Sequence, residues 1–254
     1  MGAAGCPALV SALLEAAGLS KRFGGVQAVN DLSFTIAEGE ILGLIGPNGA
    51  GKTTAFNLLS GFLAPDRGDV RFRGASVLGC KPSAVCRLGL ARTFQIVRPF
   101  PRMTVLENVT VGALARHPDA REARRRAQAV VERVGLAVRA DTRASALTLA
   151  DRKRLELARA LATEPALLLL DEVMAGLNAT ETEPIVALVR AINARGVAVL
   201  LIEHVMRAVM SLSQRLVVLN YGERIAEGPP QAVANDPRVI EAYLGEADAA
   251  AAPA

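Results

Sequence analysis

The chain has 254 residues, of which 51% are hydrophobic, 21% are charged and 4% are aromatic, with a formal net charge of +4. This length and apolar content suit one large domain, or a core with a smaller subdomain. The few aromatic residues argue against a nucleic-acid platform of stacked rings, and no apolar run reaches the roughly 18 residues that a membrane span requires.

The first predicted elements are an extension and two strands. Residues 1–16 are small and apolar and lack a charged start, so we expect an N-terminal extension rather than a signal peptide. The domain is predicted to occupy residues 17–245. Residues 29–37 alternate between apolar and polar, which is typical of a half-buried strand. The continuous apolar run at 41–46 is typical of a buried parallel strand.

The stretch "GPNGAGKTT" follows this second strand and opens a predicted helix. It matches G-x-x-x-x-G-K-[ST], the pattern of a loop whose backbone N–H groups surround phosphates. Lys52 is predicted to reach the β- and γ-phosphates, and the Thr53 hydroxyl can bind Mg²⁺. The predicted phosphate-contacting residues are Gly46, Pro47, Asn48, Gly49, Ala50, Gly51, Lys52, Thr53 and Thr54.

Residues 85–160 have a mostly helical pattern and are predicted to form an inserted subdomain. The arginine-rich stretch 121–135 is interpreted as a solvated helix face. "ARTFQ" places Gln95 after a short strand-like stretch, where a neutral amide can contact Mg²⁺ and water. This single glutamine is a weak signal by itself.

Two further apolar strands end in polar side chains. Residues 166–171 end in Asp171 and are followed by Glu172, and residues 197–203 are followed by His204. Asp171 is predicted to hold the metal, and Glu172 to orient or deprotonate the attacking water. His204 can contact the γ-phosphate and hold Glu172. An acidic helix cap and a structural histidine are the plainer alternatives, and the phosphate loop favours the catalytic interpretation.

The remaining elements complete an α/β pattern. We expect helices near 180–194 and 205–212, a strand at 215–220, a hairpin turn at 220–224, and a flexible tail at 246–254. The alternation of strands and helices predicts an α/β fold with a mixed, largely parallel sheet.

Five motifs in order, GPNGAGKTT, ARTFQ, LTLADRKRLELARAL, LLLLDE and LIEH, resemble the ATP-binding subunits of ABC transporters. The resemblance extends over nearly the whole chain and implies a P-loop NTPase core with a helical subdomain. It implies that Phe23 stacks on adenine, and that Gln95, Asp171, Glu172 and His204 have the roles given above. ATP and Mg²⁺ are the implied cofactors.

The resemblance also makes residues 147–151 a signature that contacts ATP held by a second subunit. The usual L-S-G-G-Q reads Leu147, Thr148, Leu149, Ala150 and Asp151 here, and Asn178 replaces a usual aspartate. Thr148 and Asp151 fit a capping box for the helix that follows. Ala150 would be strained if its φ were positive, and Arg152 or Lys153 could offset the charge of Asp151.

The motifs "ARTFQIVRPFPRMTVLENV", "DEVMAGLN" and "VIEAYLGE" resemble subunits of branched-chain amino-acid importers. Related urea and amide importers share this pattern. The implied partners are a second ATP-binding subunit, identical or paralogous, permease subunits at the cytoplasmic face of the inner membrane and, indirectly, a solute-binding protein. No nucleic-acid partner is expected. The apolar residues of segment 96–109 are predicted to dock on the permease or, alternatively, to pack the subdomain.

Three other classes of protein compete with a transport ATPase. The altered signature and Asn178 also suit a regulatory ATP-binding protein with little turnover. An ABC-type ATPase acting on DNA or ribosomes usually needs long coiled-coil insertions or two fused cassettes, for which this chain has no room. A simple P-loop kinase would leave Gln95 and His204 without a use.

Overall fold

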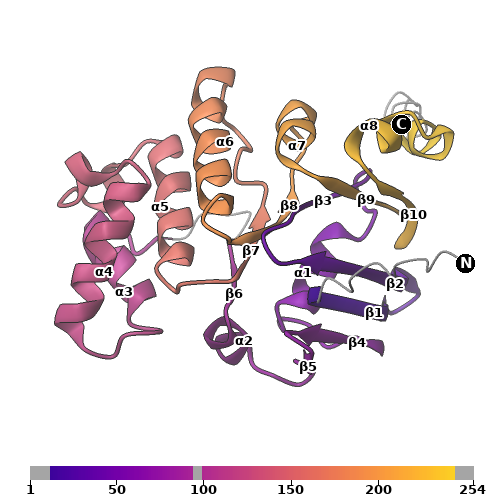
Figure 1. Ribbon diagram of the computed structural model, residues 1–254, viewed down its shortest axis with the longest axis horizontal. Coiled ribbons are helices and arrows are strands. Elements are labelled where there is room, and N and C mark those ends of the chain that lie inside the picture. The colour runs from indigo at the N-terminus through magenta and orange to yellow at the C-terminus, as the bar shows by residue number, and fades with distance from the viewer. Residues whose placement is uncertain (1–11, 94–98, 244–254) are drawn as a thin grey trace, which may run out of the picture.

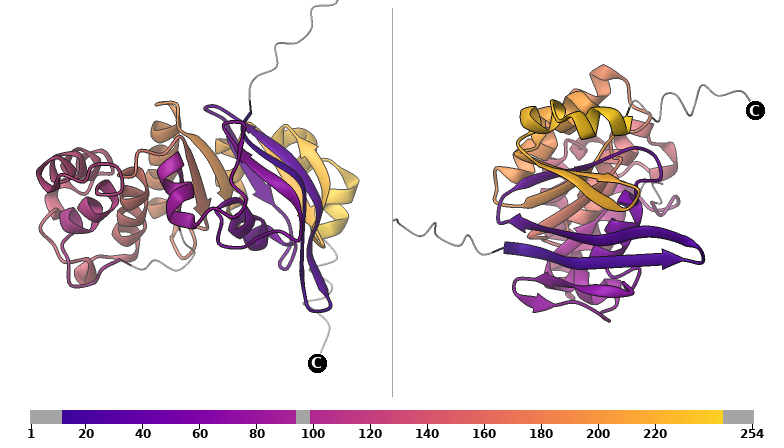
Figure 2. Two further views of the ribbon diagram at one scale, coloured as in Figure 1. Left: turned by 90° about the horizontal axis from the view of Figure 1, so that it is seen from below. Right: turned by 90° about the vertical axis from the view of Figure 1, so that its right-hand side faces the viewer.

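The computed structural model describes residues 12–93 and 99–243 (Figures 1 and 2). Its strands are β1 (Ala12–Phe23), β2 (Val26–Ala37), β3 (Ile41–Ile45), β4 (Arg67–Phe72), β5 (Ala75–Ser76), β6 (Leu90–Arg92), β7 (Leu167–Asp171), β8 (Ala198–Ile202), β9 (Arg215–Asn220) and β10 (Glu223–Gly228). Its helices are α1 (Lys52–Leu59), α2 (Pro82–Leu88), α3 (Val105–Ala113), α4 (Ala120–Arg133), α5 (Leu149–Leu161), α6 (Ala179–Asn193), α7 (Met206–Leu212) and α8 (Pro230–Ala234), with 3₁₀ turns η1 (Ala137–Arg139) and η2 (Ala144–Ala146).

The strands form two sheets. One has the order β2-β1-β4-β5 and is antiparallel, and the other has the order β10-β9-β3-β8-β7-β6. In the second sheet every pairing is parallel except that of the edge strand β10 with β9. The predicted α/β fold with a mixed, largely parallel sheet is therefore confirmed. The parallel strands end at one edge, so the residues that follow β3, β7 and β8 are brought together.

The six-stranded sheet separates two hydrophobic cores. Along β7, Leu168 and Leu170 face a core that they share with α3, α4, α5 and α6, whereas Leu167 and Leu169 face the other side. On that other side, α1 packs between the six-stranded sheet and the antiparallel sheet, with Phe56 fully buried. Because all four side chains are apolar, β7 is a continuous apolar run buried on both faces.

Figure 1 shows α3, α4 and α5 grouped at the opposite end of the molecule from β10 and α8. These three helices, with η1 and η2, are called the helical lobe below. The predicted subdomain, residues 85–160, is too wide by this description, because β6 lies inside that range and pairs with β7 in the parallel sheet. Among helices in the described parts of the chain, none combines the length and apolar character needed to cross a bilayer.

The expected N-terminal boundary differs from the structure. Strand β1 begins at Ala12, so residues 12–16 belong to the antiparallel sheet and not to the predicted extension 1–16. Leu13, Leu14 and Ala16 are buried in the core, and β1 pairs with both β2 and β4. The rest of the predicted extension and the predicted tail at 246–254 lie outside the described residues.

Candidate active site

The phosphate loop joins the end of β3 to the start of α1, as the motif predicts. Two of its glycines are enclosed by neighbouring backbone. A Cβ on Gly46, whose φ is 149°, would lie 2.1 Å from the carbonyl oxygen of Leu219. A Cβ on Gly51, whose φ is 98°, would lie 2.2 Å from the carbonyl oxygen of Ala28. Both positions therefore require glycine for conformation and for space.

The β9–β10 hairpin turn is hydrogen-bonded to the phosphate loop. The N–H of Gly222 donates to the carbonyl of Ala50 at 3.0 Å, and the carbonyl of Gly222 accepts from the N–H of Asn30 at 2.9 Å. The turn predicted at residues 220–224 is thus confirmed, with positive φ at Tyr221 and Gly222. Sequence reasoning did not foresee that this turn would fix the phosphate loop.

Lys52 lies at the first position of α1, and its side chain is buried. Its ammonium donates to the carbonyls of Gly46 at 2.7 Å and Pro47 at 2.8 Å, so the cation is held across its own loop. Thr53 beside it is exposed and Thr54 is half-buried. The first turn of α1 contains no acidic side chain, so no carboxylate offsets the positive end of the helix dipole there.

Asp171, the last residue of β7, is buried and paired. Its Oδ2 accepts from Nη2 of Arg92 at 2.9 Å, and its N–H donates to the Thr93 hydroxyl at 3.1 Å. Arg92 also donates to Asn57 of α1, so one guanidinium joins the helix after the phosphate loop to the carboxylate at the strand end. Burial raises the pKa of Asp171, and Arg92 acts in the opposite direction.

Replacing Arg92 by Met is expected to destabilise the protein by about 3 kcal/mol, because it leaves a buried carboxylate without its counter-charge. Urea unfolding at neutral pH measures this loss. Arg71→Met is the matched control, because Arg71 forms an exposed pair with Asp69 and its removal should leave the free energy of unfolding nearly unchanged. Equal effects of the two substitutions would contradict the structural importance of the Arg92–Asp171 pair.

The predicted magnesium ligands fit a hard cation. Asp171 Oδ1 is buried and has no hydrogen-bond partner, so this oxygen is available for a metal ion. The Thr53 hydroxyl is exposed at the start of α1. Gln95, the third predicted ligand and a predicted catalytic residue, lies outside the described residues. Oxygen ligands of this kind suit Mg²⁺ in a phosphate site.

Glu172 and His204 meet at the same strand edge. His204 Nε2 lies 2.9 Å from Glu172 Oε1, which brings together the ends of β7 and β8. Glu172 has a φ of 50°, an unusual value for a residue with a side chain, and its N–H donates to the carbonyl of Ile202 at 2.9 Å. Such conformations are retained where the surrounding structure fixes them, and they are common at active sites.

The signature begins α5 in the helical lobe, and Figure 1 shows α5 beyond β6 and β7 from α1. Thr148 is the N-cap and accepts from the N–H of Asp151 at 3.2 Å. The reciprocal half of the predicted capping box is absent, because the Asp151 carboxylate pairs instead with Arg139 at 3.0 Å and Arg154 at 3.7 Å. The expectation that Arg152 or Lys153 would offset this charge is therefore wrong.

The suspected strain at Ala150 is also absent. Ala150 lies in the first turn of α5 and is not among the described residues with positive φ, so an alanine fits this position. Leu149 beside it is 44% exposed. Asn178 is the N-cap of α6 in a full capping box with Glu181, a structural use that an amide performs as well as a carboxylate.

Phe23 ends β1, at the tip of the β1–β2 hairpin. Its ring is 46% exposed, and Lys21 Nζ lies 5.8 Å from the ring centre. The second strand of this hairpin passes the phosphate loop at Ala28. An exposed aromatic ring at the tip of the hairpin whose second strand borders the loop suits the predicted contact with adenine, which stays a prediction.

Two buried ionisable residues close to Glu172 and His204 were missed. Lys153 of α5 donates to the backbone carbonyl of Glu172 at 2.8 Å, and Glu203 Oε1 accepts from the N–H of Met174 at 2.8 Å. Each residue is 3% exposed. Lys153 lies four residues before buried Leu157, so helical periodicity places it on the buried face. Glu203 was visible as a second carboxylate at the end of an apolar strand.

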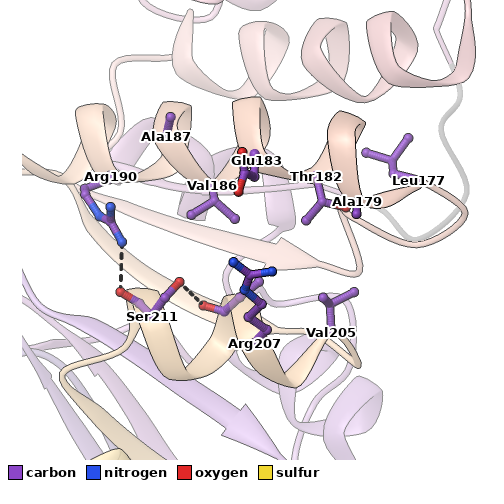
Figure 3. Close-up of a pocket in the computed structure, with 11 residues that line it drawn as sticks. Leu177, Ala179, Thr182, Glu183, Val186, Ala187, Arg190, Val205, Arg207 and Ser211 are labelled. Atoms are coloured by element: carbon purple, nitrogen blue, oxygen red, sulfur yellow. Dashed lines mark hydrogen bonds between the residues drawn. The ribbon is translucent and has the colours of Figure 1, made fainter.

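A groove of about 540 Å³ lies between α6 and α7, beside this edge (Figure 3). Figure 3 shows Leu177, Ala179 and Val205 at one end and Arg190 with Ser211 at the other. There Arg190 Nη2 donates to the Ser211 carbonyl at 3.0 Å. Strands β7 and β8 are already paired along their length, and the polar contacts of Glu172 and Met174 continue this connection beyond the strand ends.

Burial raises the pKa of Glu203 to about 7 from its usual 4.5. The folded state therefore favours the neutral acid, and this contribution to stability is lost as the pH rises from about 4.5 through about 7. We expect the free energy of unfolding of Glu203→Gln to rise by about 3 kcal/mol relative to that of the parent as the pH increases over this range. Urea unfolding of both proteins between pH 5 and 8.5 measures the difference, and a difference independent of pH would contradict the assignment.

The chain belongs to the ABC transporter family. The family model described as "ABC transporter" matches residues 29–175, and that described as "Branched-chain amino acid ATP-binding cassette transporter" matches residues 223–249. The resemblance inferred from the motifs, to an ATP-hydrolysing subunit of such a transporter, is confirmed.

Particular relatives agree with this assignment. The high-affinity branched-chain amino acid transport ATP-binding protein LivG of Salmonella typhimurium is 44% identical, with 92% of this chain and 98% of LivG covered. BraF of Pseudomonas aeruginosa, described in the same words, is 41% identical with the same coverage. An ATP-binding cassette of an ABC transporter in its ADP conformation superposes with a TM-score of 0.84 and 31% identity, covering 92% of this chain and 99% of its own.

Proposed function

We propose that the chain hydrolyses ATP to drive uptake of branched-chain amino acids by an ABC importer. The observation that supports this most is the pairing of Glu172 with His204 at the strand edge that also carries the phosphate loop and Asp171. The names of LivG and BraF support the choice of solute. Urea and amides remain the alternative solutes.

The residues suggest how the reaction proceeds. The loop N–H groups and Lys52 would bind the β- and γ-phosphates, and Phe23 would stack on adenine. Glu172 would accept a proton from water as the water oxygen attacks the γ-phosphorus, and the bond to the β–γ bridging oxygen would break. His204, hydrogen-bonded to Glu172, would hold that carboxylate in place. Asp171 and Thr53, with Gln95, would hold Mg²⁺, which would neutralise phosphate charge.

A second ATP-binding subunit would complete each site. Thr148, Leu149, Ala150 and Asp151 begin α5 in the helical lobe, so we propose that they contact ATP bound by the partner subunit. The N-terminal end of α5 presents N–H groups that suit a phosphate. Because the Asp151 charge is paired and Ala150 is unstrained, the altered signature keeps this capacity.

The permease would hold the subunit at the cytoplasmic face of the membrane. Phe100 is 42% exposed, and Arg159 lies over its ring at 5.0 Å. Met103 is half-buried, whereas Val105 is fully buried in the helical lobe, so Val105 is excluded from the predicted docking surface. Val97 lies outside the described residues. We propose that the surface around Phe100 contacts the permease.

Uptake of labelled leucine and of labelled urea tests the choice of solute. Cells containing the permease, the solute-binding protein and this chain should take up leucine, whereas cells carrying the Glu172→Gln chain should not. Uptake of urea alone would support the urea and amide alternative. ATP binding without turnover, with the permease present, would instead support the regulatory ATP-binding protein.

A further inference from the structure

We propose that Lys153 and Glu203 are positioning residues that fix the segment 172–174 between the helical lobe and the strand edge. Through Lys153, the helix that would contact ATP on the partner subunit would also set the position of Glu172 in its own site. This inference rests on the proposed function and adds a physical link between the two ATP sites.

The backbone of Glu172 is held from two different elements. Its N–H donates to Ile202 of β8 at 2.9 Å, and its carbonyl accepts from Lys153 of α5 at 2.8 Å. The residue has a φ of 50°, which is unfavourable for a side chain other than glycine. Two hydrogen bonds at one strained residue explain how that conformation is retained.

Glu203 holds the same segment two residues further on. Its Oε1 accepts from the N–H of Met174 at 2.8 Å, and His204, which contacts the Glu172 carboxylate, is its neighbour in the chain. The carboxylate at Glu172 is thus oriented by His204, and the backbone that carries it is fixed by Lys153 and Glu203.

Burying the ammonium group of Lys153 lowers the stability of the fold, so a lysine is an unexpected residue at this position. Lys153 and Glu203 are both 3% exposed, and burial raises the pKa of Glu203 although the charge of Lys153 acts in the opposite direction. An apolar residue on this face of α5 would avoid the desolvation of an ammonium group. The lysine instead reaches from the helical lobe to the backbone of the catalytic residue.

The pair should act on turnover and leave the binding of ATP nearly unchanged. Lys153→Met removes the hydrogen bond to Glu172 and retains most of the side-chain stem. We expect kcat to fall by at least about 10-fold, since small misplacements of a catalytic group are costly. The Kd for ATP should change by less than about 2-fold, because no phosphate contact is altered. Lys153→Arg, which keeps a charged donor, should recover most of the lost kcat.

The assay uses the purified full-length chain with its co-purified membrane partners, saturating ATP and Mg²⁺, at a temperature where every variant is folded. Leu161→Ala is the matched control on α5, because it removes buried apolar contacts at the last residue of the helix, about 12 Å along the helix axis from Lys153. Hydrogen exchange of peptides covering 172–176 should accelerate in Lys153→Met and not in Leu161→Ala. If Lys153→Met does not fold, Glu203→Ala replaces it, with the same expected loss of kcat.

A parental kcat in the Lys153→Met protein, or a loss no greater than that of Leu161→Ala, would overturn the inference and leave the proposed function standing. If Glu203→Ala has to replace Lys153→Met, a parental kcat in Glu203→Ala would likewise overturn the inference. A parent chain that hydrolyses no ATP with its partners would contradict the proposed function itself.

Discussion

Replacing Glu172 by Gln is expected to lower the rate of ATP hydrolysis by about 1,000-fold, because an amide cannot accept the proton of the attacking water. Gln has nearly the same shape as Glu and can still accept a hydrogen bond from His204. ATP affinity should therefore persist, and the ATP-bound dimer should have a longer life. Phosphate release at saturating ATP measures turnover, and retention of labelled ATP measures the lifetime.

The control for this substitution is Glu183→Gln. Glu183 is an exposed carboxylate on α6 at the adjacent groove, so its neutralisation should leave turnover unchanged. Hydrolysis by Glu172→Gln at the parental rate would show that Glu172 is not the general base.

Replacing Lys52 by Ala should weaken ATP binding by about 100-fold, the effect of removing a charge-assisted hydrogen bond to phosphate. The structure already places this ammonium across the loop, against the carbonyls of Gly46 and Pro47. Equilibrium dialysis with labelled ATP measures the loss. Lys81→Ala removes an exposed lysine at the start of α2 and should bind ATP like the parent. If Lys52→Ala binds ATP as tightly as the parent, the phosphate loop does not bind ATP as proposed.

The regular elements of the core could be predicted because their patterns are local. Strand β9 has the predicted bounds, residues 215–220, and β7 and β8 each differ by one or two residues. The loop at 46–54 and the meeting of Glu172 with His204 follow from parallel strands that end at one edge. Strand β1 was missed because "ALLEAA" is rich in helix formers, and pairing with β2 and β4 overrides that preference.

The contacts that surround the site depend on tertiary structure and were not predictable. Arg139 neutralises Asp151 from a 3₁₀ turn twelve residues earlier, and no periodic pattern links the two. Arg92 stands in the same short motif as Gln95, yet its pairing with Asp171 depends on how β6 aligns with β7. Lys153 was visible as a charge on an apolar helix face, but its acceptor was not.

Calorimetric titration of the purified chain with ATP, with and without Mg²⁺, tests the central claim most directly. We expect saturable binding of one ATP per chain that weakens clearly when Mg²⁺ is removed, because Asp171 and Thr53 would hold the cation against the phosphates. Absence of ATP binding, or the same affinity in both conditions, would contradict it.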